Sequence, residues 1–200
     1  SDGKEGRKLS FNVRGLPEKS ILALGGQEKG TFALTRGDSV FVSAHLGDLG
    51  DIRSQQNYRR ELEDFQKMFH VCPRTVVRDM HPDYFTSRLA GELEAERVIE
   101  VQHHHAHAVS VMAEYGLKEP VLAVSFDGTG YGGDGTLWGG EFLLARYGDF
   151  ERLAHIKYLP LPGGEKAVQE PWRMALMHLW NLYGGGVLAD RRSPDRAHPA

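Results

Sequence analysis

The segment from residue 121 to residue 147 reads VLAVSFDGTGYGGDGTLWGGEFLLARY. An apolar run covers 121–126, a glycine-rich turn follows Asp127, and a second apolar run covers 139–147. Apolar runs bounded by glycine clusters are typical of β-strands joined by turns. A further apolar run over 153–159 supplies a third strand. The segment therefore predicts a three-stranded meander.

The same order of features occurs about 100 residues earlier in the chain. Apolar runs cover 21–24, 31–34 and 40–43, so a first three-stranded meander is expected there. The motifs ILALGG at 21 and VLAVSFDG at 121 open the two meanders in the same way. We interpret this similarity as an internal duplication, with chance resemblance between short apolar runs as the alternative.

Helical periodicity separates the two meanders. The residues at the spacing of one buried helix face are Tyr58, Leu62, Phe65 and Phe69. Ser54 or Asn57 is expected to cap this helix. The elements that follow are a strand at 75–77, a helix at 84–94, a strand at 98–101 and a helix at 103–115. Alternating strands and helices predict an α/β fold.

The second meander is followed by one helix, which Pro171 begins. The apolar side of this helix carries Trp172, Ala175, Leu176, Leu179 and Tyr183. We expect an irregular segment over 1–19, a first lobe over 20–117, the start of a second lobe over 118–184, and a tail over 185–200. A second lobe that is only begun indicates a piece of a longer protein. It should leave the Trp172, Leu176 and Leu179 face partly uncovered.

The composition disfavours several classes of protein. With 24 Lys and Arg against 27 Asp and Glu, the formal charge of -3 argues against binding to nucleic acid or to a membrane surface. The single cysteine, Cys72, permits no internal disulfide and indicates a cytoplasmic protein. No apolar run approaches the roughly 20 residues that a membrane helix needs, and the N-terminal residues lack a secretion signal.

Four of the ten histidines fall between His103 and His107. On a helix, His103 and His107 project from nearly the same angle, as two ligands of one metal must. The alternatives are a solvated histidine-rich surface or a single capping imidazole. His104 and His105 point elsewhere and are poorer ligand candidates, and His105 is expected to pack against the core.

The glycine-rich turn is the second candidate site. Its backbone amides at Gly128, Thr129 and Gly130 can approach an anion closely, because no bulky side chains stand in the way. Asp127, at the end of a strand that we expect to be buried, is a plausible third oxygen ligand for the metal. A simple hairpin turn is the alternative. The turn lacks the lysine and helix of a P-loop and the context of a Rossmann motif.

Three further positions carry possible chemistry. Lys29, in the matching turn of the first meander, could meet a phosphate or carbamoyl oxygen, or it could be a solvated hairpin lysine. The polar stretch 79–84 follows a strand, where open sheets commonly place their sites; the alternative is a capped turn with Asp83 near a helix start. Cys72 has no neighbouring base and is expected to be a buried structural thiol.

Taken together, several long blocks in a fixed order resemble the C-terminal carbamoyltransferase part of the HypF family of nickel-iron hydrogenase maturation proteins. The blocks include ILALGGQEKGTFAL, RDMHPDYFTSRLA, VQHHHAHAVSVMAE and VSFDGTGYGGDGTLWGGEFLLA, and the resemblance covers about residues 20–183. It implies an actin-like, ribonuclease-H-like (ASKHA) fold of duplicated lobes, related to the enzymes that make threonylcarbamoyl-tRNA. It also implies a nucleotide between the lobes with a metal beside it.

The resemblance assigns the two histidines of the metal helix to His103 and His107 and the aspartate of the DGTG turn to Asp127. The family has a further aspartate ligand whose motif is not found before Ala200, and the closing elements of the second lobe are also missing. Gln27 and Gly30 stand where the family's glycine–lysine loop has other residues.

The resemblance implies transfer of a carbamoyl group from carbamoyl-adenylate, made from carbamoyl phosphate and ATP, to the C-terminal cysteine of HypE in cyanide ligand synthesis. The metal would be zinc or iron, since two imidazoles and a carboxylate suit both. Two alternatives stay open. One is O-carbamoylation of a small natural product on the same fold, and the other is a non-catalytic module that binds a metal or a nucleotide.

Overall fold

Six strands form the first sheet of the computed structural model, which describes residues 9–12, 20–164 and 166–184. In spatial order they are β1 (Leu9–Asn12), β4 (Ser39–Val42), β3 (Ala33–Arg36), β2 (Ile21–Ala23), β5 (Thr75–Asp79) and β6 (Arg97–Val101). Strands β2, β3 and β4 pair antiparallel as the expected meander, and β5 and β6 continue the sheet parallel to β2. The sheet is therefore mixed, as expected of this α/β fold.

Strand β1 corrects the expectation of an irregular segment over residues 1–19. It pairs antiparallel with β4, with Phe11 opposite Val40. The reason is that β4 would otherwise be an edge strand, whose backbone donors and acceptors are open to another strand. Residues 1–8 and 13–19 lie outside the described residues.

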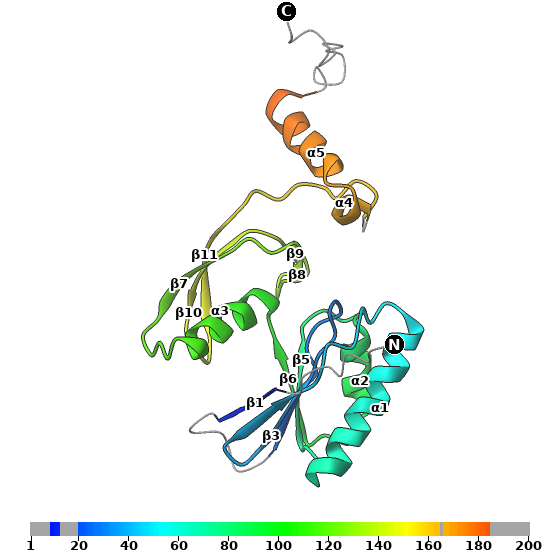
Figure 1. Ribbon diagram of the computed structural model, residues 1–200. Helices are drawn as coiled ribbons and strands as arrows, with labels where there is room; N and C mark the ends of the chain where they lie inside the picture. The colour runs from blue at the N-terminus through cyan, green and yellow to red at the C-terminus, as the bar shows by residue number, and fades with distance from the viewer. Residues whose placement is uncertain (1–8, 13–19, 165, 185–200) are drawn as a thin grey trace, which may run out of the picture. The chain divides into compact units, whose positions relative to one another are not determined.

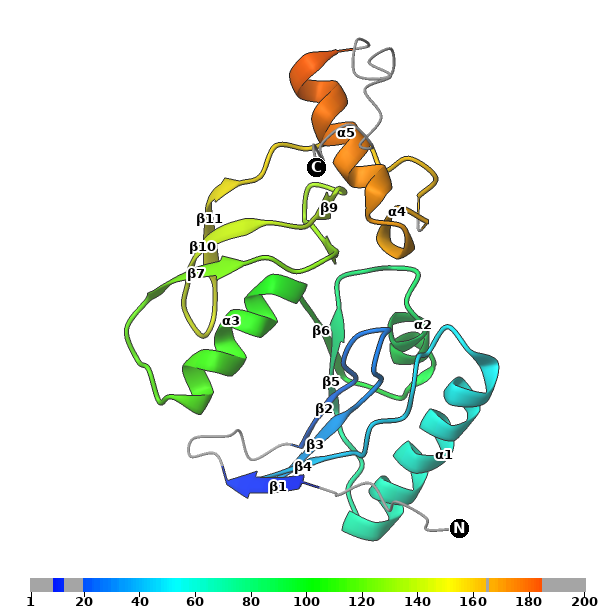
Figure 2. The same ribbon diagram turned by 45° about the horizontal axis from the view of Figure 1, so that its top comes forward.

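Helices α1 (Ile52–Phe69) and α2 (Phe85–Glu92) cover one face of this sheet (Figures 1 and 2). The helical spacing predicted for α1 is confirmed, because Tyr58, Leu62 and Phe65 are all buried. They share one core with sheet residues such as Leu34, with Phe32 just before β3, and with Phe85 of α2. The hydroxyl of Tyr58 donates to the carbonyl of Leu24 at 2.7 Å, which fixes α1 to the end of β2.

The cap of α1 is Asp51, and the assignment of the cap to Ser54 or Asn57 is wrong. The helix begins at Ile52, and the Asp51 carboxylate accepts a hydrogen bond from the backbone N–H of Ser54 at 3.0 Å. A side chain caps a helix from the residue just before it, so Ser54 lies too far along to do so. The apolar periodicity located the buried face but not the first turn.

Replacing Asp51 with Ala is expected to lower the free energy of unfolding by about 1 kcal/mol, because an N–H of the first turn loses its acceptor. Asn57→Ala, at an exposed position of the same helix, is the matched control and should stay within about 0.5 kcal/mol of the parent. Urea denaturation of the two variants measures both effects. Equal destabilisation by both substitutions would contradict the assignment of the cap.

A second sheet contains β7 (Val121–Ser125), β10 (Glu141–Ala145) and β11 (Phe150–His155), in the order β11-β10-β7. Between β7 and β10 lies a short hairpin of β8 (Gly130–Tyr131) and β9 (Leu137–Trp138). Helix α3 (His103–Glu114) packs on β7 and β10, where Met112 and Ala108 contact Ala145 (Figure 2). The three long strands of the predicted second meander are thus present, although the third begins at Phe150 rather than at 153.

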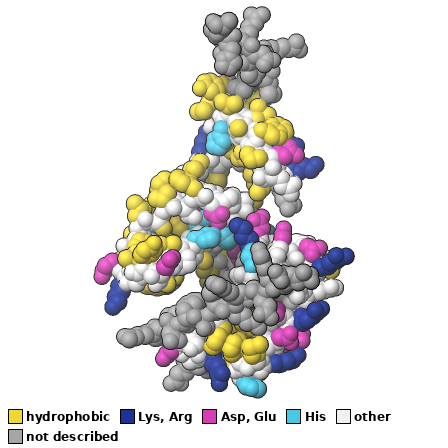
Figure 3. Space-filling view, viewed as in Figure 1, with side chains coloured by type: hydrophobic (Ala, Val, Ile, Leu, Met, Phe, Trp, Pro, Cys, Tyr) yellow, Lys and Arg dark blue, Asp and Glu magenta, His cyan; other side chains and the backbone are white. Residues whose placement is uncertain are grey.

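The other side of β7 is exposed, so the expectation of a buried strand before the glycine turn is wrong. Leu122 and Val124 are 63% and 50% exposed, while Val121 and Ala123 pack against the α3 cluster. The physical reason is the period of two along a strand, which sends alternate side chains to opposite faces. Figure 3 shows hydrophobic side chains gathered over this sheet.

The chain divides into two compact units, residues 1–154 and 155–200, so the expected lobe boundary at 117/118 falls inside the first unit. Contacts of α3 with β7 and β10 join residues 118–154 to that unit. The second unit contains α4 (Lys166–Gln169) and α5 (Trp172–Tyr183). No residue of α5 is buried, and Trp172 is 58% exposed, as expected of an uncovered face. The predicted tail at 185–200 lies outside the described residues.

Cys72 is exposed, which corrects its prediction as a buried thiol. The adjacent Val71 takes the buried position in the loop between α1 and β5. Among the described residues, no helix is long and apolar enough to cross a membrane.

Candidate metal centre

The end of the parallel strand pair places the histidine helix. Gln102 follows β6 and caps α3, since its side-chain oxygen accepts a hydrogen bond from the backbone N–H of His105 at 3.0 Å. His103 is therefore the first residue of α3, and His107 lies one turn later. Asp79 ends β5 and pairs in register with Val101, which brings it beside the start of α3. Asp127 follows the end of β7.

Three donor atoms from these elements converge. The Nε2 atom of His103 lies 2.8 Å from Oδ2 of Asp127, and the Nε2 atom of His107 lies 3.2 Å from the same oxygen. The two Nε2 atoms are 3.1 Å apart. The structure thus brings together all three residues that the sequence proposed as ligands, and each contributes one atom to a small triangle.

The triangle fits a metal cation. A tetrahedral zinc ion lies about 2.0–2.1 Å from its ligands, which places two ligand atoms about 3.3 Å apart. Oδ2 of Asp127 is shielded from solvent, and the two imidazole nitrogens are its polar neighbours in the described part of the chain. Two neutral imidazoles and one carboxylate are a donor set for zinc or iron. A cation placed among this buried oxygen and the two imidazole nitrogens would be coordinated by all three atoms.

The charges of this cluster act on one another. The hydrogen bond to Asp79 raises the pKa of His103, burial opposes this effect, and the Asp79 and Asp127 charges add to the rise. Burial raises the pKa of Asp127, but the Gly128 amide and the imidazoles of His103 and His107 outweigh it, so that this pKa lies below its usual value. The cluster therefore favours an ionised Asp127, which is the form that binds a metal.

Asp79 is the site residue whose role the sequence did not identify. Its Oδ2 lies 2.8 Å from Nδ1 of His103, on the side of the ring opposite Asp127. The sequence marks the polar stretch 79–84 as a candidate site but assigns no partner to Asp79. The signal that could have found it is its place at the carboxyl end of a strand parallel and adjacent to the strand that leads into His103.

The other two histidines of the cluster are not among the converging ligands. His104 and His105 are buried, with His104 fully so. The Nδ1 atom of His104 contacts the Gln102 amide at 3.1 Å, and Nε2 of His105 contacts the carbonyl of Arg146 at 2.7 Å. The packing expected for His105 is confirmed. Burial lowers the pKa of His104, which therefore stays neutral beside the cluster.

Packing explains two of the turn glycines. A Cβ atom at Gly130 would lie 2.6 Å from the ring of His104, and one at Gly132 would lie 2.0 Å from Nε1 of Trp138. The amide of Gly128 already donates to Oδ1 of Asp127 at 2.8 Å. Thr129 is half-buried beside them. The turn thus orients Asp127 and fits against α3.

Lys29 is exposed in the turn between β2 and β3 and has a left-handed backbone, with φ of 50°. Its loop lies near the cluster, because a Cβ atom at Gly26 would come within 3.7 Å of the His103 ring. The two departures from the family pattern have structural roles. Gln27 accepts a hydrogen bond from the N–H of Phe85 at 2.9 Å, and Gly30 leaves room for the side chain of Leu49.

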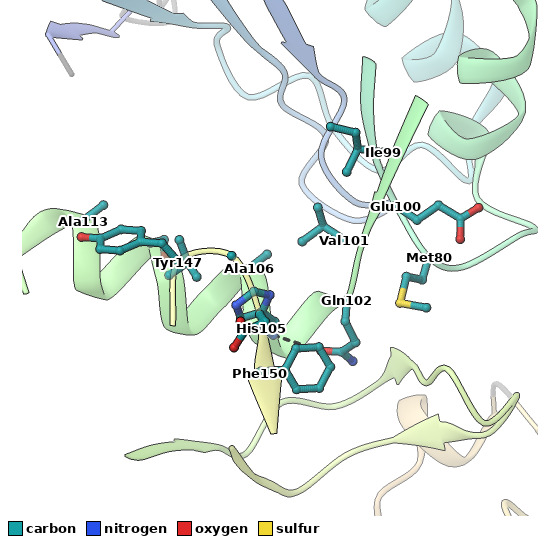
Figure 4. Close-up of a pocket in the computed structure, with 14 residues that line it drawn as sticks. Met80, Ile99, Glu100, Val101, Gln102, His105, Ala106, Ala113, Tyr147 and Phe150 are labelled. Carbon is teal, nitrogen blue, oxygen red and sulfur yellow. Dashed lines mark hydrogen bonds between the residues drawn. The ribbon is translucent and has the colours of Figure 1, made fainter. Parts of the chain in front are cut away.

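A separate pocket of about 700 Å³ lies along another side of α3 (Figure 4). His105, Val101 and Phe150 are among the residues that line it, together with the β10–β11 turn. Its lining includes none of His103, His107 and Asp127. The candidate metal centre therefore lies outside this pocket.

Comparison with known proteins gives one family over most of the chain. Residues 16–114 match the HypF Kae1-like domain, and residues 123–199 match the second subdomain of the carbamoyltransferase Kae1-like domain. Carbamoyltransferase HypF2 of Cupriavidus necator is 46% identical over 178 residues, which are 88% of this chain and 22% of that protein. Carbamoyltransferase HypF of Synechocystis is 42% identical over 174 residues, which are 86% of this chain and 23% of that protein.

Solved structures of HypF share this fold. A full-length HypF in its phosphate- and nucleotide-bound form gives a TM-score of 0.81 at 43% identity, covering 86% of this chain and 23% of that one. HypF of T. kodakarensis gives a TM-score of 0.77 at 36% identity, covering 88% of this chain and 23% of that one. The chain therefore spans just under a quarter of the length of these relatives. By its matches to both subdomains and to these structures, the chain belongs to the HypF carbamoyltransferase family.

Proposed function

We propose that this chain is the carbamoyl-transfer part of a HypF protein, which moves a carbamoyl group from carbamoyl-adenylate to the C-terminal cysteine of HypE in nickel-iron hydrogenase maturation. The observation that supports it most directly is the convergence of His103, His107 and Asp127 in a chain of this family. Carbamoyl-adenylate would form from carbamoyl phosphate and ATP elsewhere in the longer protein. A cytoplasmic location, expected from the single cysteine, belongs to the same proposal.

The proposed fold is that of two actin-like lobes, with residues 20–117 as the first and 118–184 as the start of the second. The two meanders support it, because each runs through three strands paired side by side. A nucleotide would bind near the glycine turn at 128–130 and the loop of Lys29. A full-length HypF crystallised in a phosphate- and nucleotide-bound form supports nucleotide binding.

In the proposed reaction, His103, His107 and Asp127 would hold a zinc or iron ion. The bound ion would supply Lewis acidity to the carbamoyl carbonyl. The Gly128 amide holds Asp127 in the ionised, ligand-ready form through its hydrogen bond to Oδ1. The other amides of the turn and the Lys29 ammonium would orient the adenylate phosphate and stabilise its charge.

The acceptor supplies the nucleophile in this mechanism. Its thiolate sulfur forms a bond to the carbamoyl carbon, the bond from that carbon to the adenylate phosphate oxygen breaks, and AMP leaves with the electron pair. Within the chain, Cys72 lies in a loop between α1 and β5, away from the strand ends that carry the site. Ser125, at the end of β7, has no histidine–acid pair in its sequence context. Neither residue is a nucleophile in this proposal.

The test uses the full-length protein that contains this chain, supplied with labelled carbamoyl phosphate, ATP and HypE. We expect label on the terminal cysteine of HypE, and we expect the His107→Ala variant to lose it because one of the three donors of the cluster is gone. His45→Ala, at an exposed histidine, is the control and should label normally.

Undiminished labelling by His107→Ala would remove the metal mechanism. Label on a small hydroxyl compound would favour O-carbamoylation, and nucleotide binding without any transfer would favour a binding module.

A further inference from the structure

The carboxylate of Asp79 forms a hydrogen bond with His103, one of the residues of the candidate metal centre. Its Oδ2 is 2.8 Å from Nδ1 of His103, whose Nε2 faces Asp127 on the other side of the ring. Asp79 is itself buried, with 8% of its surface exposed. The imidazole of His103 is thus held between two carboxylates, one at each nitrogen.

The position of the Asp79 carboxylate is fixed by its own neighbours. Its second oxygen, Oδ1, accepts a hydrogen bond from the backbone N–H of His81 at 2.8 Å. The hydroxyl of Ser87 donates to the carbonyl of His81 at 2.6 Å, which ties the loop to α2. The ring of His81 stacks on Tyr84 with centroids 4.2 Å apart. Both oxygens of Asp79 are therefore occupied, and the carboxylate cannot turn without breaking one of these contacts.

A carboxylate only accepts hydrogen bonds, and each nitrogen of His103 faces one: Nδ1 lies 2.8 Å from Asp79, and Nε2 lies 2.8 Å from Asp127. The surroundings of the two nitrogens differ, because Nε2 of His107 lies 3.1 Å from Nε2 of His103 and can donate a hydrogen bond to it. A neutral imidazole has a single N–H, and with that proton on Nδ1 the lone pair of Nε2 can accept from His107 or bind a cation. We propose that Asp79 is a positioning residue that holds His103 in the Nδ1-protonated tautomer and aims Nε2 at a metal cation. The part of this inference that concerns the cation rests on the proposed function, and the part that concerns the tautomer does not.

The substitution Asp79→Asn separates orientation from packing, because the two side chains have nearly the same shape. The oxygen of the new amide would keep accepting the hydrogen bond from the backbone N–H of His81, because the substitution does not change the backbone of that loop. Its NH₂ group would then face Nδ1 of His103 and could only donate to it. The variant is therefore expected to fold normally but to favour the opposite tautomer, with the proton on Nε2 and no lone pair for a metal.

The first measurement is the ¹⁵N chemical shifts of the His103 ring in the metal-free chain, at a pH where the ring is neutral. We expect Nδ1–H in the parent and a shift toward Nε2–H in Asp79→Asn. Asp83→Asn, an exposed residue of the same loop with the same change of charge, is the matched control and should leave the ring unchanged. An Nε2–H tautomer in the parent, or the same tautomer in all three proteins, would overturn the inference.

The second measurement is the affinity for Zn²⁺, added alone and followed by competition with a chelating dye. Asp79→Asn is expected to bind about 10- to 100-fold more weakly than the parent, as the loss of an outer carboxylate typically does. Asp83→Asn should bind as the parent does. Failure of the parent to bind Zn²⁺ would count against the proposed metal centre but would leave the tautomer result standing. Equal affinity in parent and Asp79→Asn would count against the positioning role of Asp79 itself.

Discussion

Replacing both His103 and His107 with Ala should reduce bound metal from about one ion per chain to essentially none. The reason is that the two imidazoles supply two of the three converging donor atoms, and the third, on Asp127, is a single carboxylate oxygen. A lone carboxylate does not hold a transition metal against the competition of water and buffer. Elemental analysis of the purified proteins after exposure to zinc and desalting measures the effect.

The matched control for this loss is the pair His45→Ala and His178→Ala, which removes the same number of imidazoles from exposed positions outside the cluster. It should keep the metal content of the parent. Circular dichroism and thermal unfolding of the metal-free proteins should show that both double variants remain folded. Equal metal content in the parent and in His103→Ala/His107→Ala would remove these residues as ligands.

The second large effect concerns stability. Phe65→Ala should lower the free energy of unfolding by about 3–5 kcal/mol, which is a large part of the stability of a domain of this size. Phe65 is fully buried between α1 and the first sheet, and its ring lies edge-on to Phe32 with centroids 4.9 Å apart. Truncation removes this contact and leaves a cavity that the neighbouring rings of Phe32 and Phe69 cannot fill without moving.

Met68→Ala, three residues along the same helix, tests whether burial is the cause. Met68 is 54% exposed, so its truncation should change stability by less than about 0.5 kcal/mol. Urea denaturation of both variants gives the comparison. A similar loss of stability in the two variants would show that burial in the aromatic core does not determine the effect of Phe65→Ala.

Periodic and local features of this protein could be predicted from its sequence. The spacing of Tyr58, Leu62 and Phe65 determines a buried helix face, because each residue of a helix is rotated by a fixed angle from the last. The same rule places His103 and His107 on one side of α3. The position of Asp127 between an apolar run and a glycine turn fixes it at a strand end. Each of these predictions depends only on residues that are close together in the sequence.

Only the tertiary structure decided which distant side chains meet. The contact between Asp79 and His103 joins residues 24 positions apart, and it exists because β5 and β6 are parallel and in register. The need for glycine at 130 comes from the His104 ring on a different element. The pairing of β1 with β4 likewise depends on an open strand edge that exists only once the sheet has formed. The local sequence pattern determines whether a segment can form a helix, a strand or a turn. Strand order and register determine which side chains face one another, and both depend on the free energy of the whole packed chain.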